Sequence, residues 1–250
     1  VGIIGANGAF LYARTMSFAD CARMDPPPDL RVLCDPRPPA QRPPSQEYIW
    51  GADSPLVRLP GDTFEPQNDE LAGRFAALAI RSQPLDYAGS VLTELGRTFT
   101  WGRPVYPDQE IYDHYQFPER TPPPPGRDAA QLGATLATRY EQGPIGTRVV
   151  EPYAGWMRTY QDVARMPGTV LLVILLIPPA LLIRRRSAGW LVPWIVGVAL
   201  LVVPPAVAEF DYRYVLPAVP LACLAAALAI RPEKSDVKEF ASDIPRNVQL

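Results

Sequence analysis

The sequence has 250 residues, of which 48% are apolar and 20% are charged, and its formal net charge is −2. These averages suit a soluble domain, but three stretches without a single charged residue, at 166–183, 187–208 and 214–230, contradict that interpretation. Because roughly 17 to 25 apolar residues cross a bilayer core, each stretch is long enough to be a membrane span. The pattern excludes a soluble enzyme, a fully disordered chain and a nucleic-acid-binding protein that works through a basic surface.

The first residues of the chain are apolar but do not form a span. Residues 1–13 include three glycines and Asn7, and the stretch is too short to cross a bilayer. The chain opens with Val1, and neither the basic segment nor the cleavage site of a signal peptide follows it. We therefore expect Val1 to be an internal position of a longer protein.

Proline is unusually frequent, with 31 residues, about two and a half times the roughly 5% of average proteins. Of these, 21 precede Arg165. Because proline clusters favour extended backbone and interrupt helices and sheets, this part of the chain is expected to be rich in loops. Helical periodicity predicts four helices between the loops, at residues 69–81, 84–99, 128–142 and 151–165. No strand or repeat is predicted.

Three of these helices carry specific expectations. Asn68 or Asp69 is expected to cap the first. The second is expected to bury one apolar face, made of Leu85, Val91, Leu92, Leu95 and Phe99. The fourth immediately precedes the first uncharged stretch and carries Tyr153, Trp156, Met157 and Tyr160. Since Trp and Tyr suit the headgroup layer, this helix is predicted to lie on or enter the membrane surface.

The orientation of the spans follows from the loop between the first two. That loop consists of Arg184, Arg185 and Arg186, and positive clusters of this kind stay in the cytoplasm. We therefore predict a mainly α-helical, multi-pass protein of the plasma membrane. Residues 1–165 would form a proline-rich, partly helical extracytoplasmic domain, residues 166–230 a membrane domain of three spans, and residues 231–250 a cytoplasmic tail.

Cysteine and histidine usage agrees with this placement. An oxidising compartment permits a disulfide between Cys21 and Cys34, although the sequence alone leaves their pairing open. Cys223 lies inside the third uncharged stretch and is most simply a small apolar residue. His114 is the only histidine, and the chain has no CxxC or HExxH spacing. We predict no metal site and identify no cofactor.

The segment between the second and third stretches, residues 209–214, is a first candidate site. Charges so close to the hydrocarbon are costly and need partners, so Glu209 and Asp211 mark a possible polar site. Arg213 offers a fork that suits a phosphate, and Tyr212 and Tyr214 flank it. The alternative is a hydrophilic turn in which Arg213 pairs with Asp211 or Glu209 while the tyrosines anchor the interface.

A second candidate is the aromatic segment at residues 99–117. Aromatic rings pack on the C–H faces of sugars, and carboxylates accept hydrogen bonds from sugar hydroxyls. The possible sugar contacts are Trp101, Tyr106, Asp108 and Tyr112. Packing of a small proline-rich domain against itself or against the membrane explains the same aromatics.

Two further features of the sequence contain prolines. In residues 35–50, Arg37 and Arg42 could hold an anion and Tyr48 and Trp50 could stack on it, but we expect a rigid, solvent-facing connector. Prolines also lie within the uncharged stretches and are expected to kink or break their helices, at Pro178, Pro179, Pro193, Pro204, Pro205, Pro217 and Pro220.

Residues 209–221, with the sequence EFDYRYVLPAVPL, resemble the last part of bacterial multispanning glycosyltransferases of the GT-C type. In that superfamily, which includes polyprenyl-phosphate-dependent mannosyl- and aminoarabinosyltransferases, an R-Y-x-L-P-x-x-P-L-like segment often opens a late transmembrane helix. Residues 8–14, GAFLYAR, also resemble extracytoplasmic stretches of related actinobacterial membrane proteins. The resemblance is strongest over roughly the last 25 residues before the tail.

The resemblance implies a function. Members of that superfamily take a sugar from a lipid-linked phosphate donor on the outer face, and a carboxylate of their first extracytoplasmic loop acts as base. That loop has no counterpart in this sequence, so we assign no catalytic residue from the superfamily. The sequence does not decide whether this chain is itself an enzyme. By position, Arg213 is a candidate contact to the donor phosphate, with Tyr212 and Tyr214 beside it. Membrane lipid and a polyprenyl-phosphate sugar donor are the expected partners.

Two other classes of function remain. A non-enzymatic, membrane-anchored module would use residues 1–165 to bind a cell-envelope partner and the spans only as an anchor. A transporter or flippase component would fit the kinked spans, but the uncharged stretches offer no buried charge for an ion or proton path.

Overall fold

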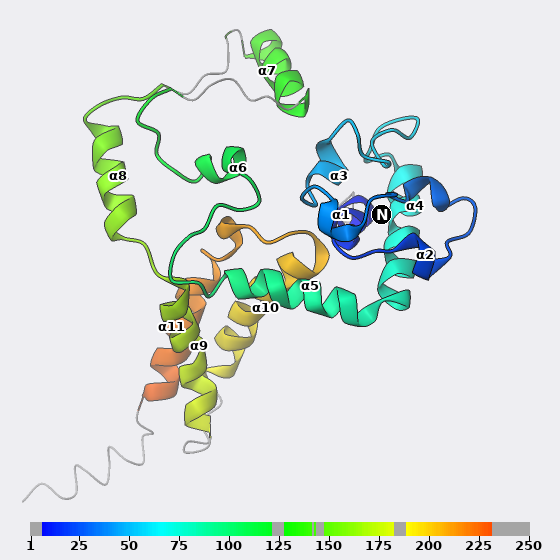
Figure 1. The fold of residues 1–250 in the computed structure, drawn as a ribbon. Helices are drawn as coiled ribbons and strands as arrows, with labels where there is room; N and C mark the ends of the chain where they lie inside the picture. The colour runs from blue at the N-terminus through cyan, green and yellow to red at the C-terminus, as the bar shows by residue number, and fades with distance from the viewer. Residues whose placement is uncertain (1–6, 122–127, 142, 144–147, 183–188, 232–250) are drawn as a thin grey trace, which may run out of the picture. The chain divides into compact units, whose positions relative to one another are not determined.

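A computed structural model (Figure 1) describes residues 7–121, 128–141, 143, 148–182 and 189–231. These residues form helices and no strand, so the prediction of a mainly α-helical protein is confirmed. In chain order the elements are α1 (Asn7–Thr15), α2 (Cys21–Met24), η1 (Arg31–Leu33), η2 (Pro39–Gln41), α3 (Glu47–Trp50), α4 (Pro66–Ser82), α5 (Pro84–Arg97), α6 (Gln109–Asp113), α7 (Asp128–Tyr140), α8 (Tyr153–Val163), α9 (Gly168–Leu182), α10 (Leu191–Val207), η3 (Tyr212–Tyr214) and α11 (Ala218–Ile230).

The chain divides into two compact units. Unit 1 comprises Val1–Gly96, Arg103–Arg165 and Pro204–Asp211, and unit 2 comprises Arg97–Gly102, Met166–Val203 and Tyr212–Leu250. The end of α10 therefore groups with unit 1, although most of that helix belongs to unit 2. Each unit is described by itself below.

The core of unit 1 forms where α1 packs against α4 (Figure 1). Gly8 permits this close approach, because a Cβ at this position would collide with the backbone carbonyl of Asp69. Tyr12 and Phe75 are fully buried and meet edge to face, with ring centroids 5.3 Å apart. The apolar start of the chain thus contributes a core helix that helical periodicity did not predict.

The cap predicted for α4 is wrong. The helix begins at Pro66, a residue that the first turn of a helix tolerates. Asn68 instead donates from its side chain to the carbonyls of Pro60 and Asp62. The carboxylate of Asp69 accepts a hydrogen bond of 2.9 Å from the backbone N–H of Ala9 in α1. Both side chains therefore hold other segments against α4.

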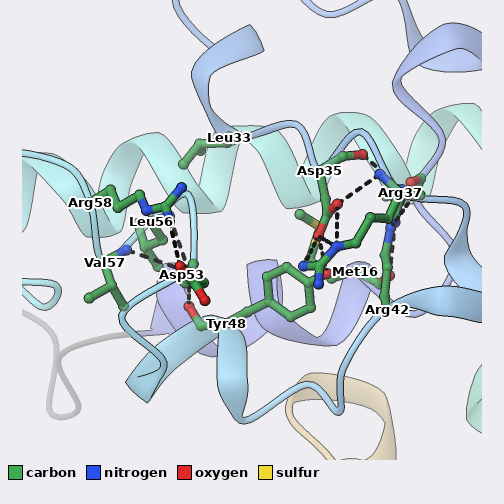
Figure 2. Close-up of polar contacts among 12 residues, drawn as sticks. Met16, Leu33, Asp35, Arg37, Arg42, Tyr48, Asp53, Leu56, Val57 and Arg58 are labelled. Carbon is green, nitrogen blue, oxygen red and sulfur yellow. Dashed lines mark hydrogen bonds and ion pairs between the residues drawn. The ribbon is translucent and has the colours of Figure 1, made fainter. Parts of the chain in front are cut away.

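The expectation of a solvent-facing connector at residues 35–50 is wrong in part, because Asp35, Ser45, Tyr48 and Ile49 are buried in unit 1 while most of residues 36–41 are exposed. Figure 2 shows the carboxylate of Asp35 between Arg37 and Tyr48. It accepts hydrogen bonds from the backbone and guanidinium of Arg37 and from the hydroxyl of Tyr48. The hydrogen bonds from Arg37 hold the pKa of the Asp35 carboxyl well below its usual range. Both Asp35 and Tyr48 are buried.

Arg42 and a disulfide close the same region. The Arg42 guanidinium donates to the carbonyls of Met16 and Ala19, at 2.9 and 2.7 Å, and so fixes the chain that follows α1 (Figure 2). Cys21 and Cys34 form a disulfide, the pairing that the sequence left open. Both arginines that could have held an anion are thus engaged in internal contacts.

Unit 2 is a bundle of α9, α10 and α11. The buried side of α11 is a row of alanines that includes Ala218, Ala222 and Ala225, and it packs on α9. Gly197 of α10 lies against Ala218 and Leu221 of α11. The indole of Trp194 in α10 donates a 2.8 Å hydrogen bond to the carbonyl of Leu175 in α9. Small residues and a side-chain hydrogen bond thus contribute to the contacts between the described parts of these helices.

The prolines in these helices do not end them. Pro178 and Pro179 lie inside α9, and Pro204 and Pro205 lie inside α10. Pro217 is the N-cap of α11, where a proline does not cost a helical hydrogen bond. The helices therefore continue through Pro178, Pro179, Pro204 and Pro205, where a kink or break was expected, whereas α11 begins only after Pro217.

The described residues contain one or two candidate membrane spans by length and composition. Residues Tyr212–Ile230 form one, and α8 with α9 form a second if the two helices are one broken span. The α10 helix is apolar but shorter. The loop predicted to fix the orientation, Arg184 to Arg186, and most of the tail lie outside the described residues.

Candidate functional site

The candidate site in unit 1 is built around the segment Pro204–Asp211, which contains the end of α10 and the start of the predicted polar loop. The last carbonyls of a helix have no partner within the helix, so other groups must satisfy them. The carbonyl of Pro205 accepts a hydrogen bond from Arg14 Nε, and that of Ala206 accepts one of 2.9 Å from the Tyr87 hydroxyl. A cation at a helix C-terminus is also favourable for the helix dipole.

Arg14 is the centre of a buried polar network. Its side chain is fully buried and lies on α1, in the element that packs against α4. Its guanidinium donates to Glu94 Oε1 at 3.1 Å, to Ser90 Oγ at 2.8 Å and to Ser17 Oγ at 3.1 Å. Sequence analysis missed Arg14, although an arginine in an apolar stretch is a signal for a buried charge that needs a partner.

Glu94 is the buried anionic partner of Arg14. Its second oxygen, Oε2, accepts a 2.8 Å hydrogen bond from the backbone N–H of Phe210. The apolar face predicted for α5 is therefore wrong in part: Leu85 and Leu92 are 85% and 64% exposed, while Glu94 is buried. The face of α5 that is turned inward carries polar groups because these groups bind Arg14 and the end of α10.

Glu209 lies beside this ion pair, as the sequence suggested for a polar site. It is partly buried, and its Oε1 accepts a 3.2 Å hydrogen bond from the hydroxyl of Tyr106. Burial, together with the negative charge of Glu94, raises the pKa of the Glu209 carboxyl to about 7. Hydrogen bonds from Tyr106 and from the Gln46 backbone, and the charge of Arg14, act in the opposite direction. A carboxyl with such a pKa can hold or release a proton near neutral pH.

This shift predicts that the stability of the protein depends on pH. An unfolded glutamic acid ionises near pH 4.3, but folded Glu209 ionises near 7, so between these values the native state binds more protons than the unfolded state. The free energy of unfolding should fall as pH rises through this range, by up to roughly 3 kcal/mol. Urea unfolding of the detergent-solubilised chain at pH 5 and pH 8 measures this loss. Glu209→Gln should remove most of it, and an equal loss in the variant would contradict the assignment.

The residues predicted as sugar contacts are distributed over both units. Trp101 belongs to unit 2 and is 70% exposed, whereas the other three belong to unit 1. Tyr106 binds Glu209, as described above. Asp108 caps α6 by accepting from Ile111 N at 2.9 Å and also accepts from Gln46 at 2.7 Å. Tyr112 is a partly buried residue of α6.

Asp211 and the three residues after it complete the predicted loop. The carboxylate of Asp211 accepts a hydrogen bond from the Tyr115 hydroxyl within unit 1. Tyr212, Arg213 and Tyr214 form η3 in unit 2, where Tyr212 is buried. The Arg213 guanidinium is exposed and lies over the Tyr214 ring, 5.1 Å from its centroid. An exposed arginine stands here at the beginning of the candidate span Tyr212–Ile230.

No known family, curated protein or solved structure matches the chain. Within the described part of the chain, no three His, Cys, Asp or Glu side chains gather where they could hold a metal ion. Among the predicted site residues, Glu209 in unit 1 can hold or release a proton near neutral pH, and Arg213 in unit 2 exposes a positive charge.

Proposed function

We propose that α9, α10 and α11 all cross the membrane. The packing of unit 2 supports this proposal, because many small residues are buried in it while many large apolar residues, apart from a few such as Leu171, Leu175 and Leu201, are exposed. Ala222 and Ala225 are fully buried, whereas Val173, Leu176 and Val192 are 61%, 55% and 70% exposed. A soluble bundle would bury its large apolar residues. Membrane helices associate through small residues and turn large ones to the lipid.

We further propose that unit 1 faces the outside of the cell. The arginine-rich loop between the first two spans supports this orientation. The Cys21–Cys34 disulfide supports it as well, because disulfides persist in oxidising compartments and are rare in the cytosol. The end of α10 and the loop that follows it would then lie at the outer surface of the membrane.

The activity that we propose is transfer of a sugar from a lipid-phosphate donor, with this chain as the C-terminal part of a GT-C-type glycosyltransferase. The observation that carries the proposal is the position of Arg213, which is exposed at the first residues of a candidate span. The phosphate of a polyprenyl lipid lies at this depth, because its chain is in the hydrocarbon and its charge is in water. The resemblance of residues 209–221 to that superfamily points to the same function.

Arg213 would act on the leaving group of this reaction. As the bond between the sugar carbon and the phosphate oxygen breaks, its electron pair stays on the lipid phosphate, while the acceptor hydroxyl oxygen bonds to the sugar carbon and gives up its proton to a base. A guanidinium fork matches two phosphate oxygens and stabilises their charge. The Tyr214 ring would hold the guanidinium in place. We assign no base, because the acidic first loop of the superfamily has no counterpart in this sequence.

Binding of a long-chain polyprenyl phosphate to the detergent-solubilised protein tests this role. A hydrogen bond to a charged group contributes about 1.5–3 kcal/mol, so Arg213→Ala should weaken binding by about 10- to 100-fold. Arg213→Lys should retain part of the affinity because it keeps the charge. The matched control is Arg81→Ala, at an exposed position of α4. Equal affinity of Arg213→Ala and wild type would remove Arg213 from the site.

One observation favours a second function, that of a non-enzymatic, membrane-anchored binding module. Tyr106 and Asp108, two of the predicted sugar contacts, make internal hydrogen bonds. If the wild-type protein does not bind polyprenyl phosphate while it remains folded, the anchored module is the better account of the chain.

A further inference from the structure

The α8 helix has an exposed aromatic face. Tyr153, Trp156 and Tyr160 are 62%, 64% and 65% exposed, and Val163 continues the row with 81%. The spacing of these residues, i, i+3, i+7 and i+10, places them on one side of the helix. Tyr153 and Trp156 meet edge to face, with ring centroids 5.4 Å apart. Apolar surface of this size and continuity marks an interaction site.

The opposite face of α8 is attached to unit 1 by hydrogen bonds. Gln161 donates to the carbonyl of Tyr115 and accepts a 3.2 Å hydrogen bond from the N–H of Phe117. Arg158 donates to the carbonyl of Pro118 at 3.0 Å and pairs with Glu151. Because these polar contacts fix the rotation of the helix, the aromatic face is directed away from residues 115–118.

We propose that α8 lies in the headgroup layer of the membrane, with Tyr153, Trp156 and Tyr160 inserted toward the lipid. Only residues 164–167 separate α8 from α9. A fully extended chain gains at most about 3.6 Å per residue, so the end of α8 stays within about 18 Å of the start of α9. If α9 crosses the membrane, the C-terminal end of α8 is therefore held near the bilayer surface, and the aromatic face begins within reach of that surface.

The chemistry of the face fits lipid headgroups better than another protein core. Tyr and Trp each combine an apolar ring with a polar tip, and they concentrate at membrane interfaces for that reason. The exposed row carries no charge, while Arg158 and Asp162 lie on other sides of the helix. This division into an aromatic side and a polar side is that of a helix lying in the plane of the interface.

This placement gives α8 a role in unit 1. Gln161 holds Tyr115, whose hydroxyl donates to Asp211 in the loop after α10. The interfacial helix is thereby connected through Tyr115 to the segment that contains Glu209. Insertion of α8 would set the height of this segment above the hydrocarbon.

Lipid contact can be measured with the full chain in vesicles that contain nitroxide-labelled phospholipids. Cys223→Ala removes the free thiol, and a fluorophore is then attached in turn at Tyr160→Cys, at Asp162→Cys on another side of α8, and at Val173→Cys on the exposed side of α9. We expect nitroxides near the headgroups to quench position 160 several-fold more strongly than position 162.

The control at position 173 separates two failures. One failure would combine two observations: nitroxides deep in the acyl chains quench position 173, while quenching at positions 160 and 162 is weak and equal. This result would overturn the placement of α8 while leaving α9 in the membrane. Absence of lipid quenching at all three positions would overturn the proposed spans as well. Shielding of position 160 from both nitroxide lipid and aqueous iodide would mean that protein covers the aromatic face.

Discussion

Replacing Arg14 with methionine is expected to lower the free energy of unfolding by about 3–5 kcal/mol, because removing one member of a buried ion pair leaves an uncompensated charge. Glu94 would keep its buried carboxylate but lose its arginine, and the carbonyl of Pro205 would lose a donor at the end of α10. Urea unfolding of the detergent-solubilised chain at neutral pH gives the change. A loss of this size is of the order of the total stability of many domains.

The control for this substitution is a second ion pair whose acidic residue also lies on α5. Arg23 pairs with Asp86 at 2.7 Å, but both side chains are largely exposed to solvent. Exposed pairs contribute about 0–1 kcal/mol, so Arg23→Met should have a small effect. The double substitution Arg14→Met and Glu94→Leu should recover part of the stability, because no buried charge then remains. Equal effects of Arg14→Met and Arg23→Met would contradict the structural role of the network.

Removal of the Asp35 carboxylate is the second large effect that we expect. Asp35→Ala would take the acceptor from the buried Tyr48 hydroxyl and from Arg37, and leaving buried donors unsatisfied costs about 1–3 kcal/mol each. A total loss of about 3 kcal/mol is therefore expected at neutral pH. Thermal unfolding followed by near-UV circular dichroism reports it, because Tyr48 and Tyr12 lie edge to face in this core.

Figure 2 contains the matched control for this substitution as well. Asp53 pairs with Arg58 on the surface, and the Asp53 side chain is 93% exposed. Asp53→Ala should change stability by less than about 1 kcal/mol. The two variants also differ in their pH dependence. Because the folded pKa of Asp35 is lowered, its contribution is complete above the unfolded value near 3.9 and is lost as pH falls further. Similar losses in both variants would mean that the Asp35 network does not stabilise unit 1.

Local patterns predicted the helices well where they are long and periodic. The four helices expected before Arg165 all occur, with ends shifted by a few residues. The α1 helix was missed because Gly2, Gly5 and Gly8, before and at its start, weaken the helical pattern, and the reason for Gly8 is its contact with Asp69 of α4. A glycine required by a distant segment has no local signature.

The candidate site shows more clearly that local sequence patterns do not predict contacts between distant residues. The sequence singled out Glu209, Asp211 and Arg213, because charges between apolar stretches are unusual. It did not predict Arg14 or Glu94, which are 80 positions apart and bind each other only in the folded chain. The periodicity of α5 assigned its leucines to the core, but the hydrogen bonds that Glu94 accepts from Arg14 and from the backbone N–H of Phe210 turn a polar face inward. Contacts between residues that are far apart in the sequence therefore determine which side chains of this site are buried.

The central claim is that residues 1–165 lie outside the cell and that three helices then cross the membrane. Labelling of intact cells with a thiol reagent that cannot cross membranes tests it most directly. In a Cys223→Ala background, whose other two cysteines form the disulfide, single cysteines are introduced at Ala52, which is exposed in unit 1, and at Ser235 in the tail. We predict labelling at position 52 in intact cells and labelling at position 235 only after permeabilisation. The reverse pattern would invert the orientation, and labelling of both positions in intact cells would contradict an odd number of spans.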